Sequence, residues 1–176
     1  LQVRGLELGV TGQITPEWSI FGGALFVDSK RRISADLAAI HRAANSGDFP
    51  AAAGFANWPI DGDSLAFTPD FSATLWTTYN FPFGLMLGGG LQHVGASQVG
   101  RPDDALRIIP NGLYGELPAY TIVNALIGYE LTENINLRLN VDNITDKKYA
   151  VSSNWNGWRA SLGASRSFLL SVGFQF

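Results

Sequence analysis

Cysteine is absent from the 176 residues, and charged side chains make up only 15% of them. Without cysteine, the chain can form neither a disulfide framework nor a thiolate metal site. A soluble domain carries about a quarter charged residues, so the scarcity of charge argues against an ordinary water-exposed surface. The net charge of −3 gives no reason to expect nucleic acid as a partner.

Long hydrophobic runs are missing as well. A membrane helix needs about 18 or more consecutive apolar residues, whereas the apolar segment 122–129 is interrupted by Asn124 and Gly128. The chain starts at Leu1, and no charged segment precedes an apolar one, so it shows no signal peptide. These features exclude a helical membrane protein. They also lead us to expect that the chain is part of a longer one.

The chain instead contains 20 glycines, many aromatic residues and runs with period-two patterning. Such runs, rich in Val, Ile, Leu, Phe, Tyr and Thr, predict strands. The only helical periodicity lies in the short Ala-rich stretch 36–44. At about ten residues and a tilt of about 45°, the predicted strands are long enough to cross the apolar part of a bilayer. We expect seven of them, over residues 3–14, 18–28, 67–81, 85–97, 119–130, 134–145 and 166–176.

The connections between these strands alternate between short and long. Tight turns occupy 15–17, 82–84 and 132–134, and long loops occupy about 29–66, 98–118 and 146–165. Transmembrane barrels have this layout, because their periplasmic turns are short and their extracellular loops are long. The fold class predicted is therefore all-β, a transmembrane antiparallel β-barrel.

The last strand has the clearest two-sided pattern. Phe168, Leu170, Val172, Phe174 and Phe176 share one face, while mainly small or polar residues occupy the other. Lipid outside and a polar lumen inside produce this alternation, although a water-soluble sheet with one apolar face would also do so. Strands 18–28 and 119–130 are apolar on both faces, so their orientation stays open.

Seven strands do not make a closed bacterial barrel, since such barrels have an even number of strands and at least about 8. We therefore expect further strands upstream of Leu1. An eighth strand within 29–66 is the alternative, but the Ala, Gly, Asp and Pro content of that stretch argues against it.

Four segments resemble the end of the TonB-dependent receptor family, in particular its siderophore receptors. They are 71–79, the glycine run 87–92, the strand and turn 137–149, and the closing strand 166–176. The third is the most specific, because it carries an Asn-x-x-Asp-x-x-Tyr pattern at Asn143, Asp146 and Tyr149. Many relatives have Pro where this chain has Ser165. The resemblance covers the chain well from about Thr68 onward, and the earlier part only in layout.

The resemblance implies a 22-stranded barrel whose lumen is closed by an N-terminal plug, with residues 1–176 as the last seven strands. It implies uptake of a ferric siderophore, with the catecholate type as a candidate, across the outer membrane of a Gram-negative bacterium. The implied partners are the siderophore, outer-membrane lipid and lipopolysaccharide, the TonB complex through the plug, and the barrel-assembly machinery. That machinery would read the alternating apolar residues from Phe168 to Phe176. No enzymatic activity and no cofactor bound by this chain are implied.

Aromatic and arginine residues in the long loops are the predicted ligand contacts. Arginine supplies charge-assisted hydrogen bonds to anionic groups, and aromatic rings supply stacking and cation–π contacts. Interfacial anchoring or binding of lipid phosphate is the alternative role for the same residues. Arg138, on a lumen-facing position, is either a residue of the transport pathway or part of a lumen salt bridge. The loop candidates are Trp58, Arg101, Arg107, Tyr114, Trp155, Trp158 and Arg159.

Neither a metal site nor a catalytic site is predicted. His41 and His93 lie far apart in the chain without converging ligands, and no Gly-x-Ser-x-Gly nucleophile elbow occurs. Two other classes of protein stay open. One is a small self-contained outer-membrane barrel, porin-like or enzymatic, and the other is a soluble β-sandwich binding module.

Overall fold

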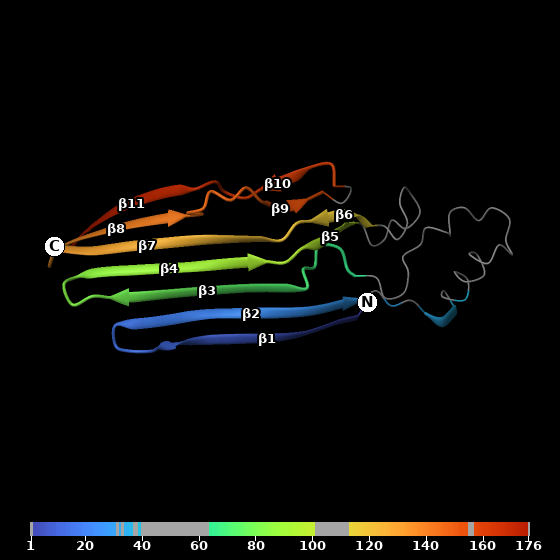
Figure 1. Cartoon of the computed structure of the whole chain (residues 1–176), viewed down its shortest axis with the longest axis horizontal. Helices are drawn as coiled ribbons and strands as arrows, with labels where there is room; N and C mark the ends of the chain where they lie inside the picture. Colours follow the sequence, from blue (N-terminus) through green and yellow to red (C-terminus); the bar gives the residue numbers. More distant parts are fainter. Residues whose placement is uncertain are drawn as a thin grey trace.

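The computed structural model describes residues 2–30, 32, 34–36, 39, 64–100, 113–154 and 157–175, with only the backbone described for 113 and 114. Within these residues, seven antiparallel strands form one sheet in the order β1-β2-β3-β4-β7-β8-β11 (Figure 1). All seven predicted strands are confirmed. They are β1 (Gln2–Gln13), β2 (Trp18–Lys30), β3 (Phe71–Asn80), β4 (Leu85–Val94), β7 (Tyr120–Thr132), β8 (Ile135–Asp142) and β11 (Ser167–Phe174).

Each long strand pairs with the previous one along the chain, so the sheet is an up-and-down meander. Its short turns lie at one end and its long connections at the other (Figure 1). No helix in the described part of the chain is long and apolar enough to cross a membrane. Of the predicted Ala-rich stretch 36–44, only Asp36 and Ala39 are described, and both are helical.

The start of β3 differs from its prediction for a local reason. β3 begins at Phe71 rather than at 67. Phe67 has a positive φ of 58°, and Pro69 has no amide hydrogen to donate to a neighbouring strand. The chain therefore becomes extended only after this segment.

The predicted long loops 98–118 and 146–165 contain short strands, which the sequence did not indicate. β5 (Ser97–Gly100) pairs with β6 (Leu113–Leu117), and β9 (Ala150–Ser153) pairs with β10 (Ala160–Leu162). These hairpins have three to five residues per strand, too few for a period-two pattern to stand out. Both lie beyond the loop end of the main sheet (Figure 1). Most of loop 29–66 lies outside the described residues.

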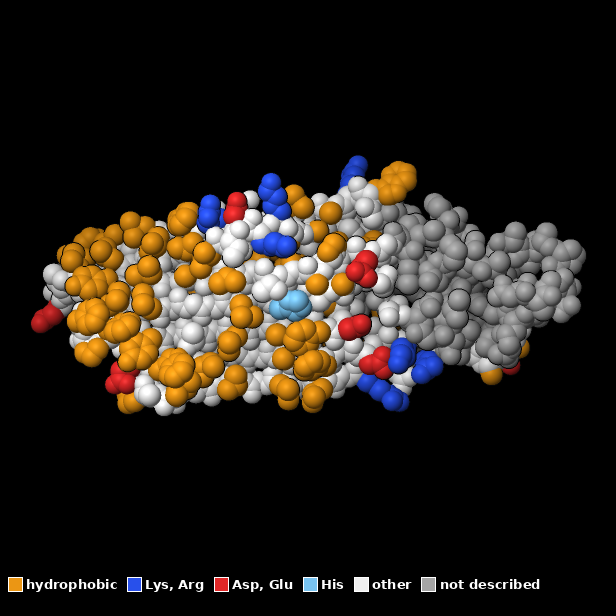
Figure 2. Space-filling view, in the orientation of Figure 1, with side chains coloured by type: hydrophobic (Ala, Val, Ile, Leu, Met, Phe, Trp, Pro, Cys, Tyr) orange, Lys and Arg blue, Asp and Glu red, His pale blue; other side chains and the backbone are white. Residues whose placement is uncertain are grey.

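The register of the strands assigns every side chain to a face, because directly opposed residues in an antiparallel pair point to the same side. Leu8 opposes Ala24, which opposes Ala73, and this row ends at Thr121 on β7. On the same face, Ala125 of β7 opposes Val141 of β8, which opposes Phe168 on β11. One face is therefore apolar over its central part, with large side chains exposed on it from every strand of the sheet except β8 (Figure 2). These include Leu6, Leu8, Val10, Trp18, Phe26, Leu75, Tyr79, Leu87, Leu91, Ile127, Tyr129, Phe168, Leu170, Val172 and Phe174.

The register also orients the two strands that the sequence left open. On β2, Ala24 and Phe26 belong to the apolar face, whereas Phe21 and Leu25 belong to the other. On β7, the odd-numbered residues from Thr121 to Tyr129 belong to the apolar face. The second face is mixed, with Glu7, Thr74, Gln92, Asn124 and Arg138 among large apolar residues, as expected for the wall of a lumen.

The glycine run in β4 makes room for a tryptophan on this lumen face. A Cβ on Gly90 would overlap the ring of Trp76, and a Cβ on Gly88 would lie 3.1 Å from the same ring. Trp76 and the two glycines are on adjacent strands and on the same face. The indole therefore lies against the backbone of β4.

Aromatic rings border the apolar face at both ends. Tyr79, Phe81 and Phe83 form one border near a short turn, with ring centroids 4.7 and 5.4 Å apart. At the loop end, Phe26 and Phe71 lie 4.8 Å apart. From Trp18 to Phe26, the strand covers about 19–22 Å of bilayer at a tilt of 35–45°. This is close to the apolar band of about 25 Å in outer-membrane barrels, so the apolar face matches a lipid-facing wall.

Leu75 and Thr74 test this assignment, because they are adjacent on β3 but face opposite sides. We expect Leu75→Arg to reduce the free energy of unfolding by about 2–4 kcal/mol, since it puts a charge near the centre of the lipid-facing band. Thr74→Arg, on the lumen face, should cost much less. The measurement is denaturant-induced unfolding of the full-length protein in lipid vesicles. Equal losses for both variants would contradict the assigned faces.

Candidate functional site

The candidate binding surface lies at the loop end of the sheet, where the hairpins β5–β6 and β9–β10 project (Figure 1). Of the predicted ligand contacts, Trp158 and Arg159 are fully described. Tyr114 is placed only by its backbone, in β6. The other four, Trp58, Arg101, Arg107 and Trp155, lie outside the described residues, and their roles stay predictions.

Trp158 and Arg159 occupy the connection of the β9–β10 hairpin. The turn is held by Asn154, whose backbone N–H donates to the carbonyl of Arg159 at 2.9 Å. The Asn154 side-chain oxygen accepts from the Arg159 N–H, also at 2.9 Å. Gly157 supplies the positive φ of 73° that the turn requires. Hydrogen bonds to Asn154 therefore hold the backbone of Arg159.

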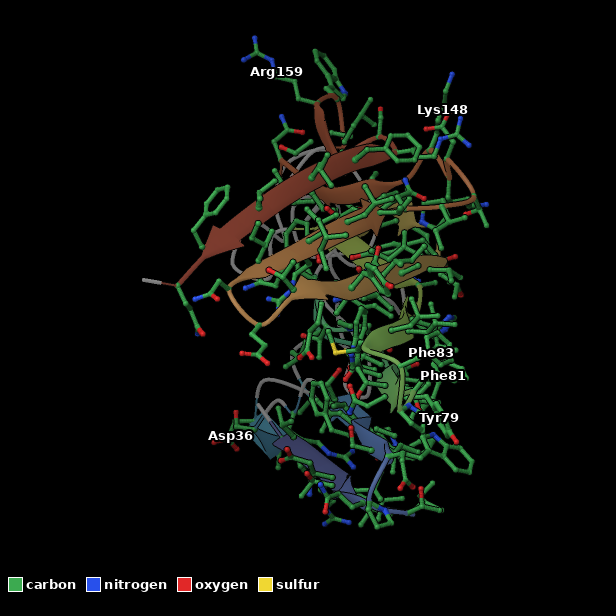
Figure 3. The ribbon with its side chains drawn as sticks, turned by 90° about the vertical axis from the view of Figure 1, so that its left-hand side faces the viewer. Asp36, Tyr79, Phe81, Phe83, Lys148 and Arg159 are labelled. Atoms are coloured by element: carbon green, nitrogen blue, oxygen red, sulfur yellow. The ribbon has the colours of Figure 1, made fainter. Side chains whose placement is uncertain are left out.

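Both side chains face solvent. Trp158 is 87% exposed, the highest value among the exposed large hydrophobic residues described, and Arg159 is exposed and projects from the edge of the molecule (Figure 3). Within the described part of the chain, no carboxylate lies at salt-bridge distance from the Arg159 guanidinium. The hairpin therefore presents an aromatic surface and a cation together.

Asn143 fixes the base of the segment that carries this hairpin. Its side chain is 2% exposed, and its backbone is left-handed, with a φ of 50°. The side-chain Nδ2 donates to the carbonyls of Lys147 and Ala164, both at 2.9 Å. Its Oδ1 accepts from the Lys147 N–H at 2.9 Å, and its backbone N–H donates to Asn124 on β7 at 2.8 Å. Asparagine tolerates the left-handed conformation better than most residues.

Asp146 and Tyr149 complete the same base. Asp146 accepts a hydrogen bond from the backbone N–H of Arg166 at 3.0 Å. The ring of Tyr149 lies 4.4 Å from that of Tyr120, and the ring packs directly against Gly163. The Asn-x-x-Asp-x-x-Tyr motif thus joins the start of the 143–166 segment to its end. The motif could be recognised in the sequence. Its structural role could not, because its hydrogen-bond partners lie about twenty residues further along the chain.

Arg138 faces the lumen from β8, between Gly128 on β7 and Ser171 on β11. It lines a hollow of about 440 Å³ near the short-turn end, together with Asn80, Met86, Glu130 and others. No carboxylate of the described residues is within salt-bridge distance of it, and both roles considered for Arg138, in the transport pathway or in a lumen salt bridge, stay predictions. Its cationic side chain is left facing the hollow.

His93 lies at the loop end of the apolar face. Its Nδ1 is 2.8 Å from the Thr121 hydroxyl, and its ring lies 5.5 Å from that of Phe71. The described residues contain no group of three or more side chains suited to holding a metal ion. His41 lies outside the described residues.

The closing strand β11 exposes the apolar side chains expected of it. Phe168, Leu170, Val172 and Phe174 lie on the lipid-facing side and are between 48% and 67% exposed. Phe176 lies outside the described residues. The lipid-facing orientation of the four described side chains is confirmed. Their role as a signal for the barrel-assembly machinery stays a prediction.

An antiparallel meander with an aromatic-bordered apolar face, a mixed lumen face, short turns and long loops is the wall of an outer-membrane β-barrel. The model of the family described as "TonB dependent receptor-like, beta-barrel" matches residues 1–144. The chain therefore belongs to the TonB-dependent receptor family, as its motifs indicated, and its location is the outer membrane.

Individual relatives support this membership. The catecholate siderophore receptor Fiu of Escherichia coli is 30% identical over 176 residues. Its closed crystal structure superposes with a TM-score of 0.73 over 99% of this chain and 21% of that one. The structure of the siderophore receptor PiuA from Acinetobacter baumannii gives a TM-score of 0.70, with 26% identity over 98% of this chain and 21% of that one. The chain spans about a fifth of the length of these relatives.

We expect Asn143→Ala to loosen the base of the 143–166 segment. The variant loses three side-chain hydrogen bonds and keeps a left-handed backbone that Ala disfavours, at a cost of about 2–4 kcal/mol. Hydrogen exchange of the full-length protein should then show faster exchange in β9 and β10. Asn140→Ala is the matched control, because no described hydrogen bond involves that lumen-facing side chain. Unchanged exchange in the Asn143 variant would contradict the role of this residue.

Proposed function

We propose that this chain is the C-terminal part of the wall of a receptor that takes up a ferric siderophore of the catecholate class. The observation that carries the proposal is the exposed Trp158–Arg159 pair, held on a hairpin at the extracellular end of the sheet. A large aromatic side chain at such a position favours an interaction role. The relatives support the same reading, since Fiu is named a catecholate siderophore receptor and PiuA a siderophore receptor.

The chemistry of the pair suits such a ligand. A ferric catecholate complex is anionic and carries flat aromatic rings. The Trp158 indole can stack on those rings, and the Arg159 guanidinium can donate charge-assisted hydrogen bonds to the oxygens around the iron. Iron enters as part of the transported ligand and not as a cofactor of the chain.

The wall alone does not provide transport. In the described sheet, β1 pairs only with β2 and β11 only with β8, which leaves one edge of each strand open. Unpaired strand edges are not tolerated in a membrane. Further strands would therefore close the barrel, and a plug contacting TonB would couple uptake to the energy of the inner membrane. In this account the chain is a binding and conducting wall and has no enzymatic activity.

The proposal is tested with Trp158→Ala and Arg159→Gln in the full-length receptor. Each variant should weaken binding of a ferric catecholate by about 10-fold or more, as expected for the loss of an aromatic or arginine contact at the centre of an interface. Trp158→Phe should restore part of the affinity, because a ring remains for stacking. The measurements are fluorescence-detected binding to purified protein and growth of iron-starved cells on the same complex.

Ser161→Ala is the matched control, since Ser161 is also exposed on the hairpin, in β10. It should bind as the unmodified protein does. If Trp158→Ala and Arg159→Gln bind and import the ferric catecholate normally while the protein is present in the outer membrane, the pair is not the ligand contact. If the unmodified receptor binds ferrioxamine B and no catecholate, the siderophore class is wrong while the receptor assignment stands.

A further inference from the structure

Two tyrosine rings are in contact at the loop end of the sheet. Tyr120 is the first residue of β7 and opposes Val94 on β4, and Tyr149 is the last residue of the Asn-x-x-Asp-x-x-Tyr motif. Their ring centroids lie 4.4 Å apart, with an angle of 36° between the ring planes. Aromatic pairs in proteins usually have centroids about 4.5–7 Å apart, so this contact is at the short end of the usual range.

The backbone holds both tyrosines at this contact. The carbonyl of Tyr149 accepts a hydrogen bond from the Gly163 N–H at 2.9 Å. A Cβ on Gly163 would overlap the Tyr149 ring, so the ring contacts Gly163 as well as Tyr120. Tyr120 is fixed by the ladder between β7 and β4. The wall of the sheet and the 143–166 segment therefore meet at this pair of phenols.

The pair keeps contact with solvent. Tyr120 belongs to the lumen face, because the odd-numbered residues that follow it on β7 belong to the apolar face. It lies at the extracellular end of that face, beyond the lipid-facing band. Both tyrosine side chains are half-buried and not enclosed. A small oxidant in water can therefore reach the two rings.

Among the described residues, no other two tyrosine rings are in contact. Tyr79 packs against Phe81 at 4.7 Å, and phenylalanine has no phenolic oxygen. Tyr129 lies on the apolar face at the opposite end of β7. The chain also has no cysteine, so no thiol of this chain competes for an oxidant. The contact between Tyr120 and Tyr149 is therefore distinguished by its chemistry as well as by its position.

We propose that Tyr120 and Tyr149 form an oxidative cross-linking site, at which a metal-activated peroxide converts the two phenols into dityrosine. Each phenol loses one electron and one proton. A carbon–carbon bond then forms between ring carbons adjacent to the two phenolic carbons, and the hydrogen on each joined carbon moves to the oxygen of its own ring. The peroxide is reduced: one hydrogen peroxide takes up the two electrons and two protons and becomes two waters.

The cross-link ties the 143–166 segment to the wall of the sheet. It adds a covalent bond to the base that Asn143 and Asp146 hold by hydrogen bonds. A covalent link between distant residues restricts the unfolded chain, as a disulfide does in proteins that contain cysteine. Oxidation therefore fixes the base of the β9–β10 hairpin and leaves the side chains of Trp158 and Arg159 out of the new bond.

The experiment oxidises the full-length protein in detergent with hydrogen peroxide and a haem peptide that has peroxidase activity, and analyses its proteolytic peptides by mass spectrometry. The expected product joins the peptide of Tyr120 to that of Tyr149, is lighter than their sum by the mass of two hydrogen atoms, and shows dityrosine fluorescence. Tyr120→Phe and Tyr149→Phe should each abolish this product, because phenylalanine keeps a packed ring but has no phenolic hydrogen to lose. Heat-modifiable mobility on a gel confirms that each variant is folded.

Tyr129→Phe is the matched control, since it removes a phenol from the same strand and should leave the yield of the joined peptide unchanged. Oxidation is continued until other tyrosines of the protein are measurably oxidised. Absence of the joined peptide from the unmodified protein at that point would overturn the proposal. A product that joins Tyr149 mainly to a tyrosine other than Tyr120 would overturn it as well. These outcomes are independent of whether the receptor binds a siderophore.

Discussion

The constraint on which the structure depends is that a backbone in hydrocarbon must satisfy its own hydrogen bonds. In the described sheet this is achieved by a continuous antiparallel ladder, with each long strand bonded to the next along the chain. The ladder permits only two side-chain directions, and one of them meets lipid. Every other residue must therefore be apolar or small, while the residues between them are free to be polar. The low charge content of the chain, its glycines and its aromatic borders all follow from this division.

Because the strand residues face either lipid or the lumen, we expect ligand-binding residues in the loops at the end of the sheet. Residues within the band are committed to lipid or to the wall of the lumen, so ligand recognition falls to the segments beyond it. The 143–166 segment shows how such a segment can be ordered without a core of its own. Asn143 and Asp146 bond its two ends together, and the hairpin with Trp158 and Arg159 projects from that base. Here a recognisable motif fixes the base from which the proposed ligand-binding hairpin projects.

The sequence predicted the long strands, their order and the alternation of turns and loops, because a period-two pattern over about ten residues is a strong signal. It did not orient β2 and β7, where Phe21, Leu25, Ile122 and Leu126 put apolar side chains on the lumen face as well. Only the pairing with neighbouring strands resolves that ambiguity. The short hairpins were missed because three to five residues carry too little pattern. Of the candidate ligand contacts, Trp158 and Arg159 are placed together on one hairpin, while the contribution of the other five remains a prediction.

The most direct test of the account uses the absence of cysteine from the chain. Single cysteines introduced at successive positions from Thr121 to Tyr129 on β7 would carry a spin label, and accessibility to oxygen and to a water-soluble nickel complex would be measured in lipid vesicles. The account predicts high oxygen accessibility at odd-numbered positions and lower values at the even-numbered positions between them. The opposite phase, or no alternation along β7, would contradict the assignment of the lipid-facing and lumen-facing sides.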